Sequence, residues 1–111
     1  MANGLIRRDA TVMNSRILYF RNVPTTLTSY NCNWSQYNVL IFNALWWDNP
    51  NNSITVARNY FAGTDGSIRI LLNQGDSSGV QYEIYKNTSS SIYIRANKAD
   101  NQRGIDVIGL V

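Results

Sequence analysis

The sequence Tyr37-Asn38-Val39-Leu40-Ile41-Phe42-Asn43-Ala44-Leu45-Trp46-Trp47 is the most apolar run in the chain. Apolar side chains occupy most of its odd and most of its even positions, and a strand places these two sets on opposite faces. Its Val, Ile, Phe, Tyr and Trp residues favour β-structure. A helix is the alternative for so short a run, but no N-cap followed by an acidic first turn precedes it. We therefore predict a central strand that is buried on both faces.

Seven other segments have the composition or the alternation of strands, and turn-rich stretches separate them. These segments are Ile17–Val23, Thr25–Cys32, Ile54–Arg58, Ser67–Asn73, Val80–Lys86, Ser91–Asn97 and Gly104–Val111. Turns or loops are predicted at 33–36, 48–52, 59–66, 74–79 and 87–90, and we find no amphipathic helical pattern. The spacing predicts an all-β fold, an antiparallel β-sandwich of about seven or eight strands with jelly-roll-like or Greek-key connections.

The length of 111 residues corresponds to one domain. We predict a single β-sandwich domain over residues 17–111. Residues 1–16 are mixed in composition, and we expect an N-terminal arm that docks on a neighbour, or a short strand.

Composition argues against two classes of partner. The net charge is +3, but the arginines are scattered and no basic run exceeds Arg7-Arg8, so no nucleic-acid partner is expected. The longest apolar run is far shorter than the roughly 20 residues that span a bilayer, and no signal peptide opens the sequence. We expect a soluble protein without membrane insertion.

The residues present also argue against catalysis. Histidine is absent, which removes the usual general base and most catalytic metal sites. Most of the 7 carboxylates occur in turn-like contexts, where Asp is an ordinary turn former. Cys32 is the only cysteine, so we expect a small buried side chain, with neither an intrachain disulfide nor a cysteine-rich zinc site. No enzyme activity, metal or cofactor is predicted.

Aromatic residues near turns are the most distinctive candidates for binding. Trp46 and Trp47 are adjacent, so a strand would direct them to opposite faces and at most one belongs to a given core face. Each indole could lie in the core, at a subunit interface or at a ligand, because exposed Trp and Tyr dominate binding hot spots. Tyr85 and Tyr93 fall on the polar faces of their predicted strands, where we expect them to be exposed or at an interface.

The order of segments over residues 37–111 resembles the tip domains of bacteriophage tail fibres and receptor-binding proteins. The segments that carry this resemblance are Tyr37–Phe42, Ser53–Phe61, Ile68–Leu72, Tyr82–Tyr85, Ile92–Arg95 and the terminal Ile105–Leu110, which has an apolar-Gly-apolar form. The likeness is one of pattern, and no functional residue can be transferred through it. It implies a β-sandwich knob that forms homo-oligomers, with a trimer favoured, and binds a host-surface saccharide or protein.

The resulting expectation is a non-enzymatic receptor-binding or tail-fibre tip module. Such a module would be made in the host cytoplasm, be part of the virion and act outside the cell. One alternative is a structural virion protein, a capsid decoration or fibre connector without a ligand of its own. Another is a cellular lectin-like carbohydrate-binding module. Function in a rigid sandwich usually lies on its end loops, and the predicted ligand contacts there are Trp47, Asp48, Asn49, Asn52, Tyr60 and Asp76.

Overall fold

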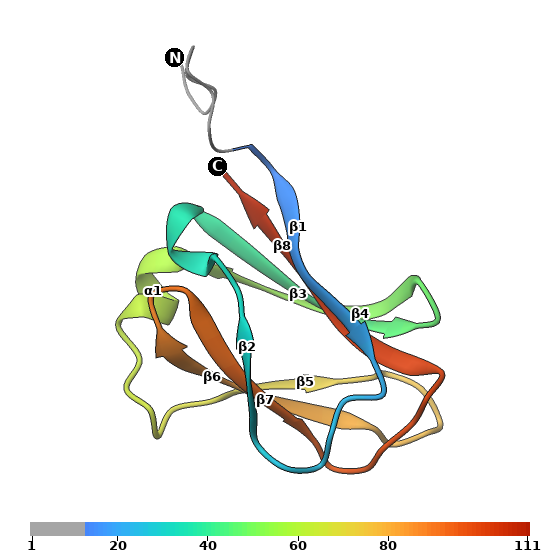
Figure 1. The fold of residues 1–111 in the computed structure, drawn as a ribbon. Coiled ribbons are helices and arrows are strands. Elements are labelled where there is room, and N and C mark those ends of the chain that lie inside the picture. The colour runs from blue at the N-terminus through green and yellow to red at the C-terminus, as the bar shows by residue number, and fades with distance from the viewer. Residues whose placement is uncertain (1–12) are drawn as a thin grey trace.

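Two antiparallel sheets of four strands each pack face to face in the computed structural model, which describes residues 13–111 (Figure 1). Sheet A contains, in spatial order, β1 (Ser15–Arg21), β8 (Arg103–Leu110), β3 (Val39–Trp46) and β4 (Asn49–Ala57). Sheet B contains β2 (Thr28–Asn31), β7 (Ser91–Ala96), β6 (Gln81–Thr88) and β5 (Ile70–Asn73). A 3-10 turn, η1 (Trp34–Gln36), and a short helix, α1 (Arg58–Ala62), complete the described part. The predicted β-sandwich is confirmed.

The pairing of strands is nested. β1 pairs with β8 in sheet A, and β2 pairs with β7 in sheet B. Each of these pairs therefore joins the beginning of the described sequence to its end. Long-range pairing of this kind within each of two packed sheets is expected for a jelly-roll-like sandwich. Within this frame β3 and β4 form a local hairpin, and β5, β6 and β7 follow one another as neighbours.

Most of the apolar run over residues 37–47 forms β3, which lies inside sheet A between β8 and β4. Its central position is therefore confirmed. Leu40, Phe42 and Ala44 are fully buried on the inner face, whereas Val39 and Ile41 are only half-buried on the outer face. The prediction of burial on both faces was wrong for these two residues, because no second layer covers β3 there among the described residues. Leu45, further along the same outer face, is buried.

The hairpin turn lies earlier than predicted. Trp47 and Asp48 form the turn, and β4 already begins at Asn49, so the predicted turn over 48–52 was placed too far along the chain. Pro50 lies opposite Leu45, and the register shift at this point leaves Asn51 as an extra residue. A proline is tolerated here because β4 is an edge strand, where one face of the backbone needs no ladder partner.

Helix α1 occupies part of the segment that was predicted as a loop over 59–66. Its Phe61 is buried and contacts the Trp34 ring edge-on, at a centroid distance of 5.1 Å. The ring of Phe42 lies 5.7 Å from Phe61. Five residues are too few for a stable isolated helix, so packing of Phe61 holds it. The periodicity that predicts helices could not register so short a segment.

Two of the buried side chains carry polar atoms. Cys32 is buried, as predicted, and burial raises the pKa of its thiol to about 12, so it behaves as a small apolar side chain. Gln74 is fully buried, and its Oε1 accepts a hydrogen bond of 2.8 Å from the hydroxyl of Tyr82.

Strand β1 begins at Ser15, inside the segment 1–16 that was predicted to be an N-terminal arm or a short strand. The rest of that prediction, residues 1–12, lies outside the described residues.

Over residues 13–111, neither helix has the length and apolar character that crossing a membrane requires.

Candidate functional site

Both adjacent tryptophans are exposed at the end of the β3–β4 hairpin. Trp46 is 42% exposed and Trp47 is 43% exposed, so the alternative in which both lie in the core is wrong for the isolated chain. Trp46 continues the inward alternation of Ala44 but lies past the edge of the core. Trp47 has a φ of 53° in the turn, and its backbone N–H donates a 2.7 Å hydrogen bond to the carbonyl of Gln102. This bond ties the turn to the connection between β7 and β8.

Arg21 extends from β1 across sheet A toward this turn. Its guanidinium carbon lies 4.9 Å from the centre of the Trp47 ring, a cation–π contact. Gly104 belongs to β8, which lies between β1 and β3, and is in register with Arg21 of β1. A Cβ at Gly104 would come within 2.9 Å of the Arg21 Cγ. Leu45, in register with Gly104 on the outer face, is only 1% exposed. The absence of a side chain at Gly104 therefore gives Arg21 room to cross the sheet.

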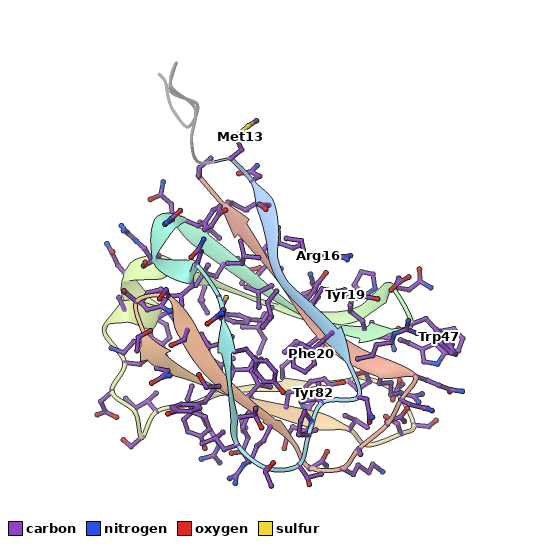
Figure 2. All side chains as sticks on the ribbon, in the orientation of Figure 1. Met13, Arg16, Tyr19, Phe20, Trp47 and Tyr82 are labelled. Carbon is purple, nitrogen blue, oxygen red and sulfur yellow. The ribbon has the colours of Figure 1, made fainter. Side chains whose placement is uncertain are left out.

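Tyr19 makes a second bridge from β1 to the turn. Its hydroxyl donates a hydrogen bond to Oδ1 of Asp48. This bond, followed by burial and the negative charge of Asp48, raises the pKa of Tyr19. Arg16 stacks on the Tyr19 ring at 4.3 Å from its centre (Figure 2). We call Tyr19, Arg21, Trp46, Trp47 and Asp48 the hairpin-end cluster.

A row of polar side chains crosses sheet A next to this cluster and supports it. Asp106 is buried on β8, where Arg16 Nε lies 3.2 Å from its Oδ2 and Asn43 Nδ2 donates a 2.8 Å hydrogen bond to its Oδ1. Ser53 in turn donates to the side-chain oxygen of Asn43 at 2.6 Å. Because the row crosses sheet A from β1 to β4, it fixes the strands on which the exposed aromatic residues are mounted.

Asp76, a predicted ligand contact, is already fully engaged. Its Oδ2 accepts hydrogen bonds from Arg103 Nε at 2.8 Å and from Asn51 Nδ2 at 3.2 Å. Desolvation raises the pKa of Asp76, but hydrogen bonds from Ser78 and Arg103 outweigh it and lower that pKa overall. Arg103 also donates to Asp100 at 2.9 Å. Asp76 therefore ties the connection between β5 and β6 to strands β4 and β8 at this end of the sandwich.

Acid is expected to weaken this tie. The lowered pKa of folded Asp76 means that its contribution is complete above the unfolded pKa of about 3.9 and is lost as pH falls through the lower, folded value. Asp76→Asn should cost about 1 kcal/mol at pH 7, since the ion pair is partly solvated, and less at pH 2. Urea unfolding at both pH values measures this. An equal loss at pH 2 and pH 7 would contradict an ionic role.

The other predicted contacts divide between the two ends of the hairpin. Asn49 is exposed and lies in register with Trp46, beside the hairpin-end cluster. Asn52 donates a 3.0 Å hydrogen bond to the carbonyl of Asn73 and holds the loop before β6. Tyr60 is 60% exposed on α1, at the opposite end of β3 and β4. The length of β3 separates it from Trp47 by roughly 25 Å, so the two cannot share one small ligand.

A pocket of about 310 Å³ opens between β1 and the connection from β2 to η1. Its lining consists of Ser15, Arg16, Ile17, Asn31, Cys32, Asn33 and Tyr37, which includes none of the predicted ligand contacts. Over residues 13–111, no three His, Cys, Asp or Glu side chains are grouped so that they could hold a metal ion.

Tyr19 and Arg21 were missed as site residues. They are two residues apart in a predicted strand, so alternation places them on one face. Nothing local indicates that this face meets the Trp47 turn, because the contact depends on the distant pairing of β1 with β8. The chain matches no family model, no curated protein and no solved structure.

Proposed function

We propose that this protein is a non-enzymatic binding module, a receptor-binding or tail-fibre tip of a bacteriophage virion, that contacts a host-surface saccharide or protein. The observation that carries the proposal is the pair of exposed indoles at the hairpin end. Large apolar rings held in water favour a partner that covers them, and Trp is among the residues that dominate binding energy.

The cluster around the indoles is organised before any partner arrives. Arg21 stacks on Trp47, and Tyr19 holds Asp48 from the neighbouring strand. Groups that are already positioned lose little conformational freedom on binding, which favours affinity. The planar guanidinium and the carboxylate supply hydrogen-bonding groups beside the rings, as hydroxylated or polar ligands require.

The test is binding of the fluorescently labelled full chain to a panel of bacterial cells and to a glycan array. Trp47→Asn is the informative variant, because asparagine tolerates the positive φ of this turn. We expect it to weaken binding by about 30-fold or more, the loss typical of a hot-spot residue. Tyr60→Ala is the matched control, an exposed aromatic residue at the opposite end, and should bind like the unmodified protein. Equal binding by all three proteins would refute the hairpin-end site.

A structural virion protein is the second candidate, and one observation favours it. Val39 and Ile41 lie in register with Leu110 and Ile108 on the outer face of sheet A, and all four are only half-buried. A homo-oligomer, with a trimer favoured, would cover such a surface. Light scattering measures the oligomeric state, and acrylamide quenching then shows whether the indoles are covered in the assembly. An oligomer with quenching-protected tryptophans that binds no cell or glycan would favour the structural role.

A further inference from the structure

The outer face of sheet B carries a second group of aromatic and charged side chains, on the other side of the sandwich from the outer face of sheet A. Tyr82 and Ile84 of β6 point into the core, so the alternate residues Glu83 and Tyr85 point outward. Tyr85 lies directly opposite Tyr93 of β7, and both rings are half-buried. Side chains in such register have Cβ atoms about 5 Å apart. The two tyrosines therefore leave neighbouring strands side by side on the outer face of sheet B.

Two arginines flank these rings and converge on one carboxylate. Arg95 donates to Oε1 of Glu83 from Nε at 3.1 Å and from Nη2 at 3.0 Å, and Arg69 Nε lies 3.9 Å from the same oxygen. The Tyr85 hydroxyl donates to that oxygen as well, at 2.8 Å. The Arg69 and Arg95 side chains are still 47% and 44% exposed. Two cations thus share one anion, which leaves positive charge and free guanidinium N–H groups beside the rings.

We propose that this face binds an anionic saccharide, a chain whose rings carry carboxylates such as those of uronic acids. The apolar faces of the sugar rings would pack on Tyr85 and Tyr93, since flat aromatic side chains offer both contact area and a polar edge. The carboxylates would pair with Arg69 and Arg95, whose planar guanidinium groups match carboxylate geometry. This site is separate from the hairpin-end cluster and does not depend on the function proposed for it.

The composition of the face favours a hydroxylated ligand over a protein surface. Leu71 is exposed opposite Glu83, but amides continue the face beyond it. Gln81 Nε2 donates a 2.8 Å hydrogen bond to the side-chain oxygen of Asn73 in the next row. The cores of protein interfaces are depleted of charged residues, whereas this face places its charges at its centre. An acidic protein partner is the alternative outcome of the test below.

Isothermal titration calorimetry with polygalacturonate tests the proposal, with neutral dextran as the comparison ligand. The full chain should bind polygalacturonate in low salt, bind more weakly as NaCl is raised, and show no heat with dextran. The double variant R69Q/R95Q should bind at least tenfold more weakly, and so should Tyr93→Thr, which keeps every charge and a strand-forming residue. Circular dichroism confirms that each variant is folded.

Two matched controls separate this site from general attraction and from the hairpin end. Arg21→Gln removes one positive charge from the other sheet and should leave polygalacturonate binding unchanged. Trp47→Asn should also bind it normally, even where it abolishes binding to cells. No binding by the unmodified protein would overturn the proposal and leave an acidic protein as the partner to seek. The proposal would also be overturned if Tyr93→Thr left polygalacturonate binding unchanged, or if Arg21→Gln lowered that binding as much as R69Q/R95Q does. Either result would mean that binding reflects charge alone.

Discussion

Gly104→Ala should destabilise the protein by about 3 kcal/mol or more, at the upper end of the cost of overpacking. A Cβ at this position would lie 2.3 Å from the carbonyl oxygen of Phe20 and 2.9 Å from the Cα of Arg21. Both are backbone atoms of β1, the strand paired with β8, so neither can move without disturbing that ladder. Urea denaturation followed by circular dichroism measures the loss.

Gly66→Ala is the matched control. A Cβ at Gly66 would meet no atom within 4 Å, and so this variant should stay within about 0.5 kcal/mol of the unmodified protein. Displacement of Arg21 by the alanine at position 104 should also reduce its contact with Trp47. If the two variants had the same stability, β1 would be free to shift away from β8, and the support described for the hairpin end would be wrong.

Phe61→Ala should cost about 3 to 5 kcal/mol, the range for truncating a fully buried phenylalanine. Its ring packs against Trp34 and Phe42, which come from different parts of the fold. Removal leaves a cavity that this end of the sandwich can fill only by moving α1, a helix without a stable conformation of its own. Thermal unfolding should show a lower midpoint, and the α1 segment should become more accessible to protease.

Tyr60→Ala provides the control within the same helix. Tyr60 is largely exposed, so its truncation should change the free energy of unfolding by no more than about 0.5 kcal/mol. A comparable loss in both variants would mean that helix propensity, rather than the packing of Phe61, holds this segment.

Local patterns in the sequence predict the elements of this fold better than their connections. Val80–Lys86 and Ser91–Asn97 alternate cleanly, and they correspond to β6 and β7 within about a residue or two at most boundaries. The turn at Trp47 was misplaced because Asp48–Asn52 has turn composition, while the edge position of β4 allows Pro50 inside a strand. Edge position is a property of the assembled sheet and cannot be read from neighbouring residues.

The same division applies to the candidate site. Trp47 and Asp48 could be predicted because exposed aromatic residues beside a turn are recognisable in sequence. Tyr60 has the same local signal, yet the hairpin carries it to the other end of the molecule. Tyr19 and Arg21 reach the site only through β8, which lies between β1 and β3. A contact that depends on pairing with a distant strand cannot be predicted from the residues next to it in the sequence.

The position of β8 also bears on how the chain acquires its structure during synthesis. Sheet A cannot join β1 to β3 until β8 has left the ribosome, although β1 emerges among the first described residues. Folds dominated by such non-local pairing form slowly. We therefore expect the nascent chain to hold β1 unpaired while the residues between β1 and β8 are synthesised, a period in which its unpaired backbone is exposed to aggregation and to chaperones.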